Sequence, residues 1–178
     1  MILGVDPGGR WWGWALLAGG AYVEAGVLDL SELGEQVVLA GLRKIAARAD
    51  GIAIERPGGV HPGIIRSEPA RAAKASADLS RAAWVAGELA GRCAGEGQRV
   101  QRAEVIEVRS YHFGQGSVDD AAVAALVKHR VRAWPERILG RGNAYGAKGY
   151  LLAQHLPHAH DGAAVALYAA ATGLREAA

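Results

Sequence analysis

The chain opens with MILGVDPGGR, residues 1–10, a short apolar run that ends in a proline–glycine turn. The apolar run predicts a buried strand over residues 2–6, with Asp6 at its end. Residues 11–17 and 21–29 predict two more strands, and the Ala-Gly-Gly between them predicts a turn. The chain is therefore expected to begin as a three-stranded antiparallel meander.

Beyond this meander, helical and strand patterns alternate along the chain. The predicted elements are a helix over 32–49 capped by Ser31, a strand over 51–55, a loop over 57–70, an alanine-rich helix over 72–93, a strand over 99–108, a helix over 118–131, an irregular glycine-rich segment over 132–150, and a final helix within 151–172 that is broken near Pro157 and stopped at Gly173. This order predicts an α/β fold, with helices on both faces of a mixed sheet. Residues 1–178 are expected to form a single domain.

Composition limits the classes of function. The chain has 178 residues, of which 51% are hydrophobic and 21% charged, as in an ordinary globular protein. A net charge of +2 does not by itself argue for nucleic acid. The single cysteine, Cys93, excludes an internal disulfide and a cysteine-only metal site, and we expect it to be buried. No stretch approaches the roughly 20 apolar residues of a membrane span, and no signal peptide is apparent, so a cytoplasmic location is expected.

Three acidic residues stand at the edges of apolar elements. Asp6 ends the first strand, Glu55 ends the strand over 51–55, and Asp161 lies at the start of the late apolar helix. Carboxylates in such places are costly unless they are paired or bind a cation. His158, three residues before Asp161, would share its helix face and could ligate a metal or accept a proton. Together the four residues predict one site for Mg²⁺, with Mn²⁺ as a substitute.

Each carboxylate also has a structural interpretation. Asp6 could serve only the turn, Glu55 could form an exposed ion pair with Arg56, and Asp161 could be a helix N-cap. The three together, in a workable order, favour the metal site over these separate roles. Two further histidines near this site, His155 and His160, are predicted to lie on the surface.

These residues resemble the RuvC-type Holliday junction resolvases of the RNase H-like, or retroviral integrase, superfamily. The resemblance spans nearly the whole chain and rests on Gly4-Val5-Asp6-Pro7-Gly8 with Gly13, on Ile54-Glu55, and on His158-x-x-Asp161 with the apolar residues that follow. It implies an RNase H-like fold in which Asp6, Glu55 and Asp161 hold two magnesium ions. His158 occupies a position where the family has Asp or His.

The activity that the resemblance implies is paired nicking of opposite strands at a four-way DNA junction by a homodimer, leaving 5′-phosphates. Its setting would be the cytoplasm of a bacterium or of a phage-infected host. The segment over 132–150 is interpreted as an insertion relative to compact members, which is compatible with a phage-encoded branch.

Two departures from the family pattern concern catalysis and junction opening. Where the family has an aromatic shortly after the glutamate, this chain offers only His61. Where the family has a lysine after a glycine-rich turn, the sequence is acidic at Asp119 and Asp120. Lys148 is our candidate to stabilise the developing phosphate charge, with Lys128 as the alternative.

Basic and aromatic residues gather in two segments that flank the predicted site. Such residues suit phosphate neutralisation and base stacking. The candidates for DNA binding are Arg56, His61, Arg66, Arg71, Lys74, Lys128, Arg132, Arg141 and Tyr145. The alternative is that both segments are solvated faces of an arginine-rich protein.

Other aromatic positions have two interpretations each. Trp11, Trp12 and Trp14 are expected in the core or over the sheet, with Trp11 or Trp12 at the rim of the site as the alternative. The helix over 72–93, with Trp84, could form a dimer contact or pack on the sheet.

Three rival functions stay open at the level of sequence. The first is another RNase H-like nuclease that acts on ribosomal RNA precursors or RNA–DNA hybrids. The second is a junction-binding protein without catalysis. The third, an actin-like sugar kinase, is disfavoured because the chain is too short for two lobes.

Overall fold

The computed structural model describes residues 1–57, 68–139, 144–146 and 149–174. Four residues predicted at the site or the DNA surface, namely His61, Arg66, Arg141 and Lys148, lie outside these ranges.

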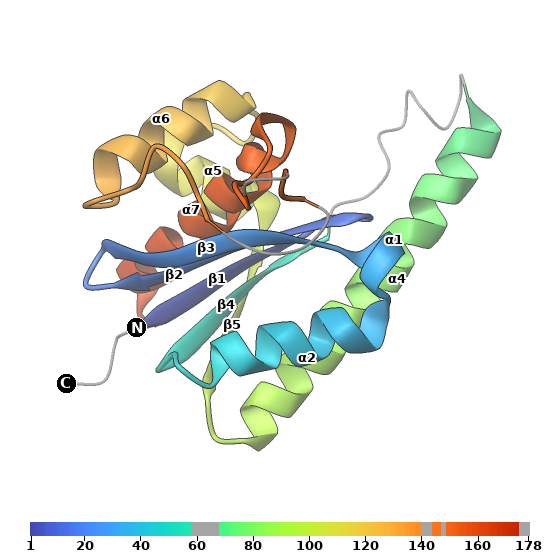
Figure 1. The fold of residues 1–178 in the computed structure, drawn as a ribbon, viewed down its shortest axis with the longest axis horizontal. Helices are drawn as coiled ribbons and strands as arrows, with labels where there is room; N and C mark the ends of the chain where they lie inside the picture. Colours follow the sequence, from blue (N-terminus) through green and yellow to red (C-terminus); the bar gives the residue numbers. More distant parts are fainter. Residues whose placement is uncertain (58–67, 140–143, 147–148, 175–178) are drawn as a thin grey trace.

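Five strands form one mixed sheet in the spatial order β3-β2-β1-β4-β5 (Figure 1). They are β1 (Ile2–Pro7), β2 (Trp11–Ala18), β3 (Ala21–Asp29), β4 (Gly51–Arg56) and β5 (Arg99–Glu104). β1, β2 and β3 pair antiparallel, whereas β4 runs parallel to β1 and β5 runs parallel to β4. The predicted meander and mixed sheet are therefore confirmed.

Helices cover both faces of this sheet (Figure 1). On one face lie α5 (Val105–Phe113), α6 (Asp120–Arg130) and α7 (Leu156–Thr172), and the short 3₁₀ helix η1 (Ala153–His155) leads into α7. On the other face lie α2 (Glu35–Ala46) and α4 (Pro69–Gly95), with α1 (Leu30–Leu33) leading into α2. Each face has its own apolar core.

Alternation along the strands assigns each side chain to one core. Ala53 of β4 and Ala103 of β5 belong to the core beneath α7, whereas Ile54 belongs to the core beneath α2 and α4. Cys93 is also in the second core and fully buried, as predicted. Because alternate residues of a strand face opposite layers, successive side chains at the ends of β1 and β4 point in turn toward α7 and toward α4.

Helix α7 lies directly on the backbones of β1 and β2, and glycine makes this approach possible. A Cβ on Gly13 would lie 1.7 Å from the carbonyl oxygen of His158. A Cβ on Gly4 would lie 2.1 Å from the carbonyl oxygen of Gly162. The obstacle is backbone in both cases, so no side chain could turn aside to make room. These glycines therefore fix the height of α7 above the sheet.

The turn that follows Asp6 is tied down by charge. Arg10 donates from Nη2 to Asp29 Oδ2 at 2.8 Å, and the same carboxylate accepts from the Ser31 amide at 2.9 Å. Burial acts to raise the pKa of Asp29, but these hydrogen bonds and the Arg10 charge outweigh it, so the pKa lies below its usual value. Asp29 is the N-cap of α1, and the prediction that Ser31 caps this helix was wrong.

Three predicted element boundaries were wrong. The helix predicted over 32–49 is interrupted at Gly34, which has φ +76° and separates α1 from α2. The strand predicted over 99–108 ends at Glu104, where a capping box between Glu104 and Glu107 begins α5. Pro157 does not break the last helix, because it lies in the first turn, where proline is tolerated. The predicted stop at Gly173 is confirmed.

The tryptophans of β2 pack mainly in the core. Trp12 and Trp14 are 0% and 6% exposed and belong to the core beneath α2 and α4, as predicted. Trp11 faces the other layer, where its ring stacks on His155 at a centroid distance of 3.9 Å. Within the described ranges no helix is long and apolar enough to cross a membrane.

Candidate metal centre

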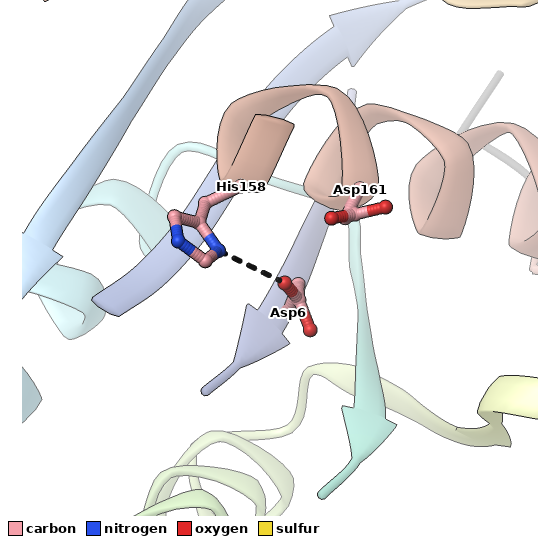
Figure 2. A group of neighbouring side chains, drawn as sticks. All are labelled: Asp6, His158 and Asp161. Carbon is pink, nitrogen blue, oxygen red and sulfur yellow. Dashed lines mark ion pairs between the residues drawn. The ribbon is translucent and has the colours of Figure 1, made fainter. Parts of the chain in front are cut away.

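Three of the predicted site residues converge at one end of the sheet (Figure 2). Asp6, His158 and Asp161 each offer a ligand atom, and these atoms all lie within 4.8 Å of one another. Nδ1 of His158 lies 3.9 Å from Oδ2 of Asp6. The two side chains are 31% and 16% exposed, so the cluster is recessed but accessible to solvent.

The fold explains why these residues meet. Asp6 is at the end of β1, and Val5 pairs with Ile54 of the parallel strand β4, so Asp6 and Glu55 are neighbours on the face toward α7. His158 and Asp161 are three residues apart on α7 and share a helix face. Asp161 lies in the second turn of α7, so the alternative that it caps this helix was wrong.

Glu55 stands beside the three-residue cluster and is coupled to it by charge. Burial raises the pKa of Glu55 to about 9, and the charges of Asp6 and Asp161 contribute. Burial likewise raises the pKa of Asp161 to about 7, with contributions from Asp6 and Asp120. Glu55 and Asp161 therefore keep their protons at pH values at which an exposed carboxyl group would have lost them. A crowded set of oxygen ligands with too little positive charge fits a bound divalent cation.

His158 responds to the same charges in the opposite sense. Burial of its ring would lower its pKa, but the carboxylates of Asp6 and Asp161 raise it above the ordinary value. Without a metal, the ring is therefore poised to hold a proton against Asp6. A neutral His158 could instead ligate a metal, because the imidazole nitrogen is a common metal ligand.

Two residues that the sequence did not indicate also act on this cluster. The charge of Arg109 acts against the shifts just described: it lowers the pKa values of Glu55 and Asp161, although burial and the neighbouring carboxylates raise them more. Arg109 lies on α5, one turn before His112, whose Nε2 is 2.9 Å from the carbonyl oxygen of Ala164. Because Asp161 lies one turn before Ala164 on α7, this contact brings Arg109 toward the carboxylates. Arg109 is thus a cation at the centre, contributed by a helix whose first four residues were predicted as the end of a strand.

Asp120 is the second such residue. It begins α6, just after the N-cap Asp119, whose side chain accepts from the Ala122 amide at 2.8 Å. Its charge raises the pKa values of both Asp161 and His158. The acidic character of this position was visible in the sequence, but its closeness to α7 was not.

Solved structures share this arrangement of sheet and helices. RuvC from Thermus thermophilus in complex with a Holliday junction substrate matches 95% of this chain and 92% of its own, at 18% identity and a TM-score of 0.51. Another structure of Thermus thermophilus RuvC matches 98% of each chain, at 18% identity and a TM-score of 0.52. The chain has the fold of RuvC. No family model matches the sequence, and no curated protein does.

The RuvC fold confirms the predicted resemblance at the level of architecture. It also allows the predicted DNA-binding residues to be placed on that architecture. Arg56 ends β4 and pairs with Glu104, and Arg71 pairs with Glu68 at the start of α4. Lys74 is exposed on α4, and Lys128 is exposed in the last turn of α6. These four stay candidates for contact with DNA.

Arg132 and Tyr145 have contacts of their own on this fold. The guanidinium of Arg132 donates to the carbonyl oxygen of Gly19 at 2.7 Å, in the β2–β3 turn. That turn lies at the end of β2 away from Asp6. Tyr145 packs beside β3, where its hydroxyl oxygen would lie 2.5 Å from a Cβ on Gly26. Both residues therefore help to cover the edge strand β3.

The prediction that His155 and His160 lie on the surface was wrong. Both are 5% exposed. His155 stacks on Trp11, and His160 packs against Trp134 at a centroid distance of 5.4 Å. Burial lowers the pKa of His160 to about 4, with a contribution from Lys128, so its ring is neutral near pH 7.

The crowded carboxylates make a prediction about stability without metal. Glu55 has a folded-state pKa of about 9, above its ordinary value of 4.5, so the folded chain keeps a proton that the unfolded chain releases. This contribution to stability is complete below about pH 4 and is lost as the pH rises toward 9. Glu55→Gln should raise the free energy of unfolding at pH 8 by about 1–3 kcal/mol and change little at pH 4.

Urea denaturation in a chelator at pH 4 and pH 8 measures this effect. Glu88→Gln is the matched control, because Glu88 is solvent-accessible on α4 and pairs with Arg92 at the surface. It should not stabilise the protein at either pH. If wild type and Glu55→Gln lost stability equally between the two pH values, Glu55 would not have the raised folded-state pKa described above.

Proposed function

We propose that this chain is a metal-dependent endonuclease that cuts four-way DNA junctions by paired nicks, acting as a homodimer. The observation that carries the proposal is the convergence of Asp6, His158 and Asp161 beside a buried Glu55. Carboxylate oxygens in such a group are the ligands that magnesium and manganese prefer. The RuvC structure bound to a Holliday junction supports the choice of a four-way junction as substrate.

Asp6, Glu55 and Asp161 would hold two Mg²⁺ ions, and Mn²⁺ would substitute for them. When bound, such ions activate the attacking water and stabilise the leaving oxygen of a phosphodiester. His158 either completes the ligand set or accepts the proton of the attacking water. The presence of an imidazole among the ligands suits manganese at least as well as magnesium.

The remaining chemistry belongs to charges around the cluster. A phosphodiester gains negative charge in its transition state, and a fixed cation beside it lowers the barrier. Arg109 is the cation at this centre within the described ranges whose charge reaches both Glu55 and Asp161. We therefore propose that Arg109 stabilises this charge, and Lys148, which lies outside the described ranges, stays the candidate from the sequence.

Cleavage of a labelled immobile four-way junction tests the proposed function. The panel contains the junction, a flap, a linear duplex and an RNA–DNA hybrid, each with Mg²⁺ or Mn²⁺. Symmetric nicks in opposite strands of the junction, absent with Asp6→Asn, are the expected result. Preferred cutting of the hybrid would instead support an RNase H-like nuclease acting on RNA. Tight junction binding without cleavage in either metal would support a non-catalytic junction-binding protein.

Arg109 gives a second test at the same centre. Arg109→Gln should lower the single-turnover cleavage rate about 10- to 100-fold, because it removes the cation that faces the developing charge. Arg109→Lys should retain most of the rate. Junction affinity measured in Ca²⁺ should change much less than the rate. Arg92→Gln, a change of equal charge on the far end of α4, is the control. Equal rates for Arg109→Gln and Arg92→Gln would contradict the role of Arg109.

A further inference from the structure

A cleft of about 170 Å³ opens at the end of β4, on the opposite face of the sheet from the carboxylate cluster. Its floor is the sheet at Ile54 and Glu55, and its far wall is α4 at Ala83 and Ala86. Pro57 and two arginines, Arg56 and Arg102, complete the lining. No residue of this cleft other than Glu55 belongs to the metal centre.

Strand alternation places the arginines in the cleft and the carboxylate beyond it. Ile54 pairs with Arg102, so Ile54, Arg102 and Arg56 lie on the face of the sheet toward α4, where they line the cleft. Glu55 points the other way, toward α7 and the cluster. The cleft and the metal centre are therefore on two sides of the same strand end, one residue apart along the chain.

Arg102 is the free cation of the pair. Arg56 is held in an ion pair with Glu104. Within the described ranges Arg102 has neither an ion pair nor a side-chain hydrogen bond, and it is exposed. Its guanidinium reaches toward Gly87 of α4, where a Cβ would lie 3.4 Å from Nη2. The small residues of α4 leave room for this guanidinium beside the cleft, and its donors have no partner among the described residues.

We propose that this cleft binds a phosphodiester group of the DNA strand that is cut, next to the scissile phosphate, with Arg102 as its main donor. A guanidinium offers two parallel N–H donors that match phosphate oxygens. The small side chains of Ala83 and Ala86 leave room for a phosphate in the cleft and offer no polar group of their own. Arg56 adds a second positive charge to the lining. The inference rests on the proposed function, because it assigns a part of the same substrate.

The position of the cleft indicates what this phosphate contact would do. A strand that crosses the end of β4 would meet Arg102 on one side of the sheet and the carboxylates on the other. Phosphate contacts of this kind fix the register of the strand and read no sequence. Arg102 would therefore position the scissile phosphate without touching the reacting atoms.

Salt-dependent junction binding tests the subsite. Dissociation constants of a fluorescent four-way junction are measured in Ca²⁺ at several salt concentrations for wild type, Arg102→Gln, Arg102→Lys and Arg99→Gln. Arg99 is the matched control, because it begins the same strand at its other end and is also exposed. Arg102→Gln should weaken binding about 5- to 10-fold and reduce the slope of log K against log salt by about 0.9. Arg102→Lys should keep the slope, and Arg99→Gln should match wild type.

The outcomes separate the subsite from the proposed function. If wild type binds and cuts the junction but Arg102→Gln and Arg99→Gln bind with the same slope, the subsite is overturned and the nuclease stands. If Arg102→Gln lowers affinity without changing the slope, Arg102 does not contact a phosphate, and the subsite is overturned again. If wild type neither binds nor cuts the junction, the proposed function fails, and a DNA strand fails with it as the occupant of the cleft.

Discussion

Asp6→Asn is expected to lower the single-turnover rate of junction cleavage by at least about 10³-fold at saturating Mg²⁺. Asp6 interacts electrostatically with His158, Glu55 and Asp161. It lies 3.9 Å from His158, and its charge raises the pKa values of both Glu55 and Asp161. An amide has the same shape but one less negative charge and weaker metal affinity. The variant is therefore expected to lose affinity for the proposed metal while keeping the geometry.

The same substitution should not harm the fold. Without a metal, Asp6 disfavours the charged forms of Glu55 and Asp161 and attracts His158, so its neutralisation removes two unfavourable interactions and one favourable interaction. We expect the free energy of unfolding in a chelator at pH 8 to equal or exceed that of wild type, and junction affinity in Ca²⁺ to fall much less than the rate. Loss of activity together with a well-folded, DNA-binding protein is the signature of a catalytic role.

Asp50→Asn is the matched control for this experiment. Asp50 lies at the opposite end of the sheet, where it pairs with the N-terminal ammonium of Met1. The variant carries the same change of charge, and its cleavage rate should stay within a few-fold of wild type. Asp6→Asn that kept a tenth or more of the wild-type rate would contradict a metal centre built on Asp6.

Much of the sheet could be predicted because its signals are local. The strands β1, β2, β3 and β4 follow apolar runs bounded by glycine turns, and the structure places them within a residue or so of the predicted ranges. The residues of the cluster were found in the same way, since Asp6 and Glu55 end apolar strands and His158 shares a helix face with Asp161. The end of β5 could not be found, because residues 105–108 alternate like a strand. There the reciprocal hydrogen bonds of Glu104 and Glu107 begin a helix instead.

The residues that the sequence did not reveal are placed at the cluster by the packing of helices against one another. Arg109 and Asp120 act on the cluster only because α5 and α6 pack beside α7, and no spacing in the sequence encodes that contact. His155 and His160 were placed on the surface because histidines are polar. In the structure their rings pack against aromatic partners, His155 against Trp11 and His160 against Trp134. Local pattern thus gave the carboxylates, whereas tertiary packing supplied the charges that tune them.

The last prediction follows from the close contact between α7 and the sheet. Gly13→Ala should lower the free energy of unfolding by about 3–5 kcal/mol, at or beyond the upper end of ordinary overpacking. Its Cβ would lie 1.7 Å from the carbonyl oxygen of His158 and 2.2 Å from the carbonyl carbon. Both are backbone atoms at the start of α7, so the helix itself must move. That movement would carry His158 away from Asp6, and activity should fall even where the variant still folds.

Gly91→Ala is the control that separates this clash from a general effect of alanine. Gly91 lies within α4, and a Cβ there would meet nothing within 4 Å. The substitution should stabilise the protein by about 0.5–1 kcal/mol, because alanine is the better helix former. Urea denaturation of the two variants at pH 6 should therefore show shifts of opposite sign. A Gly13→Ala protein as stable as wild type would mean that α7 does not rest on the backbone of β2. The placement of His158 and Asp161 over Asp6 would then need another cause.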